Sequence, residues 1–146
     1  MIAALFFAAV CDQSLWSHVY HPKRLQVIQP CVEYSGVIEY ERPEPDGDVH
    51  IRVGLDPNQG TPPLNQRNRV AQHSCLVVEP VCVRTPKQKD VGDVCKGYTS
   101  PPVPKVGTHV IVRGPLVKDN SANHQWIEVH PAEIQSGGNA AGGSKP

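Results

Sequence analysis

The sequence has no excess of either charge. Its 146 residues include 14 Lys and Arg and 14 Asp and Glu, so the formal net charge is zero. Proteins that hold nucleic acid chiefly by bulk attraction to phosphate carry a strong positive charge. The balance excludes a highly basic nucleic-acid coat protein. It leaves room for a local basic patch, because seven basic residues lie between positions 67 and 105.

Long hydrophobic runs are also missing. The apolar run at residues 2–10 has nine residues, far short of the roughly 20 that a helix needs to cross a bilayer. It has the length of the hydrophobic region of a secretory signal but lacks the positive charges that precede one. We interpret residues 1–15 as a signal or docking segment and expect a secreted or cell-surface protein. If the run is not a signal, the alternative is a cytoplasmic protein in which it packs on the domain or on a neighbouring subunit.

Several motifs of common enzymes and metal proteins are absent. The chain has no Cys-x-x-Cys pair, no Gly-rich phosphate loop, no Gly-x-Ser-x-Gly elbow and no His-Glu-x-x-His helix. These absences exclude a zinc knuckle, a P-loop nucleotide site, a hydrolase of the nucleophile-elbow type and a zincin protease. Aromatic residues make up only 5% of the chain, so a base-stacking platform for single-stranded nucleic acid would be thin.

The five cysteines, at positions 11, 31, 75, 82 and 95, are therefore expected in disulfides or as buried thiols. A bridge between Cys82 and Cys95 closes a loop of about 14 residues, worth about 3 kcal/mol in the chain-entropy model. If the N-terminal segment is removed, Cys31 and Cys75 become the second pair. Spacing alone does not fix this connectivity.

The residues that are abundant favour strands and turns. There are 20 valines against seven leucines, together with 15 prolines and 12 glycines. Valine suits the pleated surface of a sheet, and proline and glycine suit tight turns. At this length one domain is expected. The composition therefore predicts a single all-β domain.

Hydrophobic patterning divides the chain into short elements. Alternation or apolar runs predict strands at 31–42, 49–56, 76–83, 106–114 and 126–130, the last extended by Ile134. In the first strand Val32, Tyr34, Ile38 and Tyr40 share one face. The turn at 43–48, with Asp-Gly at its centre, predicts that the first two strands form a hairpin. Thr85, Pro86 and Gln88 resemble a capping box and predict a short helix at 86–95. Residues 57–75 show no periodicity and are interpreted as a long surface loop. The domain is expected to span 16–135 and to be followed by a flexible tail at 136–146.

This order of elements is similar to the OB-fold. The motifs that carry the resemblance are Val32-x-x-x-Gly36-Val37, the helix between the third and fourth strands, and Val106-Gly107-x-x-Val110-x-Val112-x-Gly114. The resemblance covers residues 25–135 and implies a five-stranded Greek-key barrel. OB-folds as a class bind oligonucleotides, oligosaccharides or proteins around strands two and three.

A second set of motifs resembles small exported proteins of bacteria and archaea whose function is uncharacterised. These motifs are Tyr20-His21-Pro22-x-Arg24-Leu25, Asp46-Gly47-Asp48-x-His50-Ile51 and Trp126-x-Glu128-x-His130-Pro131. This resemblance implies export and an OB-like fold, but no activity.

The most specific candidate for a metal-binding or catalytic site lies on the last expected strand. Alternation places Trp126, Glu128 and His130 on one face, with Glu128 and His130 about 7 Å apart. They could bind a metal ion, or Glu128 could orient His130 as a catalytic base. If the protein is an enzyme, we expect His50 to be a third catalytic residue. The alternative is a solvent-facing strand edge capped by the tryptophan. His18 and His21 are a weaker metal pair, because Pro22 ends the helical turn that they would need.

A second candidate is the polar face of the 49–56 strand. His50, Arg52 and Asp56 share this face, and Arg52 is the best single contact for an anion. Arg67 and Arg69 in the adjoining loop, together with Trp126, complete the expected ligand-binding set. The alternative is a solvated face on which Arg52 forms a weak ion pair.

These observations favour a binding module over an enzyme. The expected ligand is an oligonucleotide, a glycan or a protein, and no cofactor is assigned. One alternative is a metal-dependent hydrolase such as a nuclease, using a divalent ion with Glu128 and His130 together with His50 or His21. Another is a self-associating structural subunit docked through its apolar N-terminus, because a net charge near zero favours association.

Overall fold

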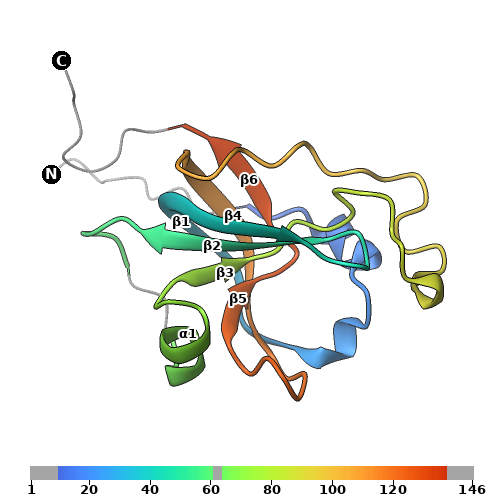
Figure 1. The fold of residues 1–146 in the computed structure, drawn as a ribbon, viewed down its shortest axis with the longest axis horizontal. Coiled ribbons are helices and arrows are strands. Elements are labelled where there is room, and N and C mark those ends of the chain that lie inside the picture. The colour runs from blue at the N-terminus through green and yellow to red at the C-terminus, as the bar shows by residue number, and fades with distance from the viewer. Residues whose placement is uncertain (1–9, 61–63, 138–146) are drawn as a thin grey trace, which may run out of the picture.

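The computed structural model describes residues 10–60 and 64–137 and shows a protein made mostly of β-strands (Figure 1). The strands are β1 (Leu25–Pro43), β2 (Val49–Leu55), β3 (Leu76–Val78), β4 (His109–Asp119), β5 (Ile127–Val129) and β6 (Glu133–Ser136). The helices are α1 (Gln66–Ala71) and three short 3-10 helices at Gln13–His18, Pro22–Arg24 and Lys89–Val91. None of the helices in the described ranges is long and apolar enough to cross a membrane.

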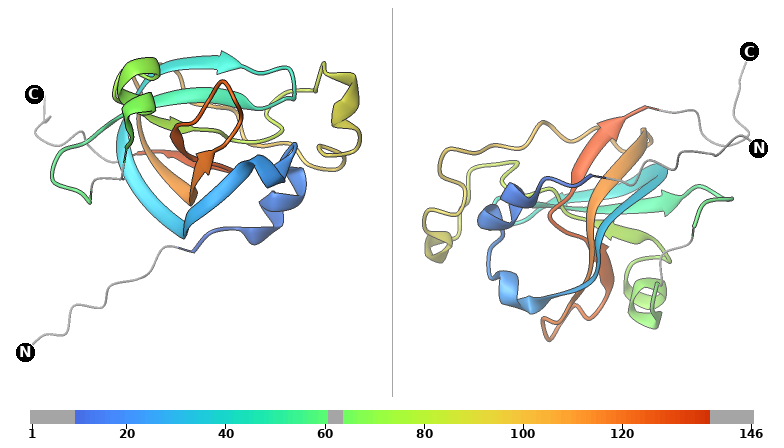
Figure 2. Two further views of the ribbon diagram at one scale, coloured as in Figure 1. Left: turned by 90° about the horizontal axis from the view of Figure 1, so that it is seen from below. Right: turned by 180° about the vertical axis from the view of Figure 1, so that it is seen from behind.

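The strands form one six-stranded mixed sheet in the order β1-β2-β3-β5-β4-β6. β3 and β5 run parallel, and every other pair is antiparallel. β1 also pairs with β4, so the first strand has a partner on each side. The views in Figure 2 show the strongly curved sheet that results, with β6 at its rim.

The long first strand confirms the alternation seen in the sequence. Val32, Tyr34 and Ile38 are buried in the main core, and β1 and β2 form the predicted hairpin. At Gly36 the strand passes from one partner to the other, because this residue pairs with Val110 of β4 and with Leu55 of β2. A Cβ at Gly36 would overlap the carbonyl oxygen of Gly54, so only glycine fits where the three strands meet.

The helix predicted at 86–95 is not confirmed. In its place are a single 3-10 turn at Lys89–Val91 and a glycine, Gly92, with φ +61°, a backbone conformation that ends a right-handed helix. The α-helix lies instead in the segment interpreted as a loop. Its N-terminus is capped by Asn65, whose side chain accepts from the Asn68 backbone in a reciprocal capping box.

The strand boundaries also differ from the prediction. β3 is three residues long rather than eight. β4 begins three residues later than the strand predicted at 106–114 and extends five residues beyond its predicted end, to Asp119. The predicted last strand is two strands, β5 and β6, separated at Pro131, which has no N–H for a sheet ladder. β5 pairs with Leu116–Lys118, whereas β6 pairs with Val110–Arg113.

Two disulfides, Cys11–Cys31 and Cys82–Cys95, cross-link the chain. Cys82 and Cys95 are bonded, as the loop argument favoured, but Cys31 is bonded to Cys11 and not to Cys75. Cys75 is a buried free thiol because it lies at the start of β3, where its Sγ donates to Glu39 Oε2 at 2.8 Å.

The structure describes only parts of the predicted segments 1–15 and 136–146. The Cys11 disulfide and the buried side chain of Leu15 join residues 11–15 to the sheet. Residues 1–9, where most of the predicted signal or docking segment falls, lie outside the described residues, as do residues 138–146 of the predicted tail. β6 ends at Ser136.

Candidate functional site

A cluster of ionisable side chains lies in the interior of the protein. Its members, which we call the buried polar cluster, are Asp48, His50, Glu79, Glu128 and His130, and none is more than 6% exposed. They come from the start of β2, the end of β3 and β5. The cluster forms because β3 pairs with β2 on one side and with β5 on the other.

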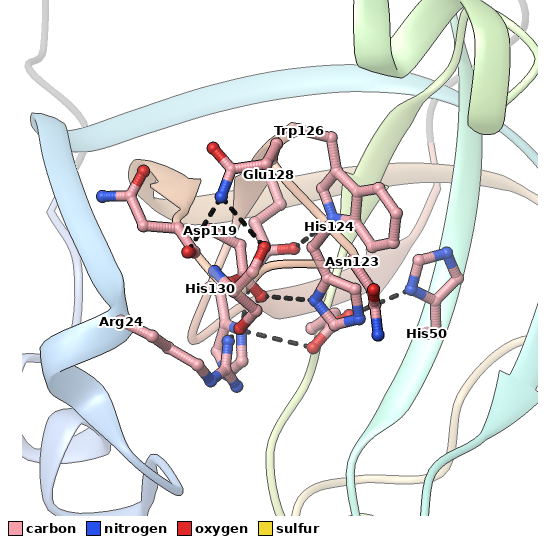
Figure 3. Close-up of polar contacts among 12 residues, drawn as sticks. Arg24, His50, Asp119, Asn123, His124, Trp126, Glu128 and His130 are labelled. Atoms are coloured by element: carbon pink, nitrogen blue, oxygen red, sulfur yellow. Dashed lines mark hydrogen bonds and ion pairs between the residues drawn. The ribbon is translucent and has the colours of Figure 1, made fainter.

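His130 makes contacts to three carboxylates. Its Nδ1 lies 2.9 Å from Glu128 Oε1 and 3.2 Å from Glu79 Oε2, and its Nε2 lies 3.4 Å from Asp48 Oδ2. The other oxygen of Glu128 accepts from Trp126 Nε1 at 2.7 Å. Figure 3 shows Trp126, Glu128 and His130 turned toward one another. Because a carboxylate only accepts, Nδ1 of His130 must carry a proton.

His50 is held at both ring nitrogens. Its Nδ1 lies 3.0 Å from Glu79 Oε1, and its Nε2 lies 2.9 Å from Gln72 Oε1. Arg52 Nε donates to the same Gln72 oxygen at 2.9 Å. Because arginine can only donate, that oxygen is an acceptor for both neighbours, and both nitrogens of His50 act as donors. His50 is therefore an imidazolium in this arrangement.

Burial and neighbouring carboxyl groups have opposite effects on the pKa values of the two histidines in the cluster. Burial alone would lower the pKa of His130, but the surrounding carboxyl groups of Asp48, Glu128 and Glu79 raise it well above its ordinary value. The pKa of His50 is raised by Glu79 and Gln72 against the same burial effect. Burial, assisted by the charge of Glu128, raises the pKa of Glu79. Three carboxylates thus face two imidazoles, which supply at most two positive charges.

The structure corrects the placement of Trp126, Glu128 and His130 on a solvent-facing edge. They share a neighbourhood, as the alternation predicted, but Trp126 is 5% exposed and the other two are fully buried. β5 lies between β3 and β4, so both of its neighbours in the sheet are strands. Alternation along a strand identifies a shared face but not what covers it.

The polar face of β2 is also covered. His50 is buried, and Arg52 lies over the Tyr40 ring at 4.4 Å and donates to Gln72 after α1. Asp56 pairs with His109 at 2.5 Å. The expected ligand face therefore carries internal hydrogen bonds.

The remaining predicted site residues lie apart from the cluster. Arg67 and Arg69 are exposed on α1 and donate to backbone carbonyls, including those of His124 and Leu64. His18 stacks on Tyr98 with 4.4 Å between ring centroids, and His21 contacts the Tyr20 ring. Within residues 10–60 and 64–137, the one group with metal-site spacing is Asp48, Glu79 and His130.

Asp48, Glu79 and Gln72 belong to this site but were not predicted from the sequence. Glu79 could have been predicted, because it is the only charged residue in the apolar run 76–83 and a buried carboxylate requires a partner. Asp48 was hidden in an Asp-Gly turn, where an aspartate is ordinary. Gln72 had no such signal.

A second feature is a groove of about 340 Å³ along β6, which we call the β6 groove. Its lining includes residues 132–135 and residues 100–103. Its apolar lining includes Leu15, Tyr98, Pro102, Val103, Ile111 and Ile134. Arg113 and Glu133 are among its charged residues.

Comparison of the sequence with models of known protein families finds no match, and comparison with curated proteins finds none. The features of this protein that bear on function are therefore the buried polar cluster and the β6 groove.

Proposed function

We propose that this chain is an exported, disulfide-stabilised OB-like barrel that binds an extended segment of a protein partner and is not an enzyme. The observation that carries the proposal is the β6 groove, which runs along the last strand of the sheet order. An extended peptide that pairs with such a strand gains backbone hydrogen bonds, and the groove beside it accepts side chains.

The strand pairings support the OB-like assignment. β1 pairs with β2 and β4, β3 pairs with β2, and β5 lies between β3 and β4. Five strands connected in this way match the connectivity of a small Greek-key barrel, and β6 adds to its outside. The two disulfides favour an oxidising compartment, which fits an exported protein of the kind that the sequence resembles.

The register of β6 indicates which of its peptide groups are available. The Gly137 N–H donates to the His109 carbonyl at 3.2 Å, and the register pairs Ile111 with Gln135 and Arg113 with Glu133. Since hydrogen-bonded pairs alternate along an antiparallel ladder, the peptide groups of Ile134 and Ser136 point away from β4. A partner strand would pair with these groups.

The groove chemistry favours a peptide over an oligonucleotide or a glycan. Its lining contains the acidic residues Asp12 and Glu133, and Arg113 is bound to Glu33 at 2.6 Å. A polyanion would meet no free cation among these residues. Stacking surface is also scarce, because Tyr98 already stacks on His18 and Trp126 is buried.

The buried polar cluster does not support the hydrolase alternative. It does bring Glu128, His130 and His50 together, but their side chains are at most 3% exposed. A hydrolase needs its reacting groups within hydrogen-bond reach of the substrate. The structural-subunit alternative depends on the apolar run, of which residues 2–9 lie outside the described part of the chain. A second copy pairing with β6 is an outcome of the test below.

The test is selection of nine-residue peptides by phage display on the intact, oxidised protein, followed by NMR titration of the selected peptides. Oligothymidylate and a chitin oligosaccharide serve as comparison ligands. We expect peptide-induced shifts at residues 100–103 and 132–136. Ser136→Pro, which removes one outward N–H, should abolish binding, and Ser136→Ala should preserve it. Shifts confined to another surface, binding of only a comparison ligand, or concentration-dependent self-pairing at β6 would each contradict peptide capture.

A further inference from the structure

We infer that Asp48, Glu79 and His130 form a buried site for one divalent transition-metal ion, with Zn²⁺ the best fit. This inference goes beyond the proposed function, because the site lies in the interior and does not depend on what the β6 groove binds. The nearest nitrogen or oxygen atoms of the three side chains lie within 4.8 Å of one another.

Two atoms of this group have no hydrogen-bond partner. They are Asp48 Oδ2 and His130 Nε2, and the two side chains are 2% and 0% exposed. A buried polar atom without a partner is costly, and most such atoms in folded proteins are satisfied. The two atoms lie 3.4 Å apart, so a single cation bound to both would satisfy both.

The spacing of these atoms matches a metal site better than a direct hydrogen bond. Asp48 Oδ2 and His130 Nε2 are 3.4 Å apart, whereas a charge-assisted N–H···O bond has a length of about 2.7–2.9 Å. Zinc binds nitrogen and oxygen ligands at about 2.0–2.2 Å in a tetrahedral arrangement. Two such ligands on one ion lie about 3.3–3.5 Å apart.

Neighbouring groups hold the side chains of Asp48 and His130 in place. The other oxygen of Asp48 accepts from the Cys82 backbone N–H at 3.0 Å. The other nitrogen of His130 donates to Glu128, which in turn accepts from Trp126. A carboxylate that receives the second N–H of a histidine is the usual outer support of a histidine ligand, because it fixes the tautomer and the ring orientation.

The chemistry of the surroundings also favours a cation. Asp48, Glu79 and Glu128 bring three carboxyl groups into the interior, and none of them is more than 6% exposed. A buried carboxylate is unfavourable unless it is paired or coordinates a metal ion. A divalent ion among these carboxyl groups would be such a partner.

The experiment measures metal binding by the full-length, oxidised, untagged protein after dialysis against a chelator. Zn²⁺ or Co²⁺ is added with long incubation, since a buried site fills slowly. We expect one equivalent bound per chain and the absorption bands of four-coordinate Co²⁺. X-ray absorption of the Zn²⁺ form should show one imidazole, oxygen neighbours and no sulfur.

Variants distinguish this site from surface histidines. Asp48→Asn and His130→Gln should weaken Zn²⁺ binding more than 100-fold, and Glu128→Gln, which acts through His130, by about 10- to 100-fold. The double variant His18→Gln/His21→Gln is the matched control and should bind as the wild type does. Near-ultraviolet circular dichroism reports whether each variant is folded.

Three outcomes would overturn the inference. They are no stoichiometric metal on the wild-type protein, two or more imidazoles or any sulfur in the absorption spectrum, and unchanged binding by folded Asp48→Asn. If the cluster variants do not fold, the wild-type stoichiometry and the Zn²⁺ spectrum decide alone. None of these outcomes affects the proposed peptide binding at β6, which has its own test.

Discussion

The imidazole of His124 donates through Nδ1 to Asp119 Oδ2 at 2.7 Å, in the turn that follows β4. Arg24 donates to the same oxygen at 2.7 Å, and His124 stacks on Trp126 with 4.3 Å between ring centroids (Figure 3). Burial alone would raise the pKa of Asp119, but hydrogen bonds from His124 and Ser121 hold it well below its usual range. The hydrogen bond to Asp119 raises the pKa of His124.

This pair predicts a pH window of stabilisation. The contribution of Asp119 is present above its unfolded pKa of 3.8 and is lost as pH falls through its lower folded value. The contribution of His124 is present below its unfolded pKa of 6.5 and is lost as pH rises through its higher folded value. His124→Gln should therefore lower the free energy of unfolding at pH 6 and converge with the wild type at pH 9.

The size of this effect is limited by solvent, because the His124 side chain is 40% exposed. We expect a difference of about 1 kcal/mol or less at pH 6, measured by urea denaturation of both proteins at each pH. His21→Gln, at an exposed histidine with no carboxylate contact among the described hydrogen bonds, is the control. A difference that stays constant from pH 6 to pH 9 would show that the ion pair contributes nothing.

Gly36→Ala should destabilise the protein by about 1–3 kcal/mol. The added methyl would overlap the Gly54 carbonyl and lie 2.8 Å from Val53 Cγ1, where the sheet passes from β4 to β2. The matched control is Gly60→Ala, because a Cβ at Gly60 meets nothing within 4 Å. Urea denaturation should separate the two variants. Equal stabilities would mean that the junction at Gly36 relaxes without cost.

Cys75 should not react with iodoacetamide at pH 8 in the folded protein. Burial, together with the hydrogen bond to Glu39, raises the pKa of its thiol to about 12, and the thiolate is the reactive form. In urea without reductant, mass spectrometry should show one alkylated cysteine per molecule, at Cys75. Rapid labelling of the folded protein, or alkylation at Cys31 in its place, would contradict this assignment.

Replacing Cys82 and Cys95 together by serine should lower the free energy of unfolding by about 3 kcal/mol, because the bridge closes a loop with a sequence separation of 13. The bonded pair also anchors the second core group, which includes Val81 and Val117. Denaturant midpoints of the oxidised proteins give the measurement, and Cys75→Ser, which removes a thiol without opening a loop, is the control. A double variant as stable as the wild type would show that the loop is already constrained by other contacts.

The sequence determined the elements that depend on local pattern. Alternation at Val32, Tyr34 and Ile38 predicted β1 and its buried face, and the Asp-Gly turn predicted the hairpin with β2. The short loop between Cys82 and Cys95 favoured their pairing, which the structure confirms. These features are local, because a strand face or a short loop is specified by neighbouring residues.

Tertiary structure decided what those elements face. The same alternation that grouped Trp126, Glu128 and His130 could not show that β5 lies between two strands, which moves the group from an exposed edge to the interior. Asp48 and Glu79 join His130 only because β3 pairs with both β2 and β5, and Cys31 pairs with Cys11 because β1 passes beside the N-terminal segment. Long-range strand pairing brings together residues that are far apart in the sequence, and no local pattern encodes such a contact.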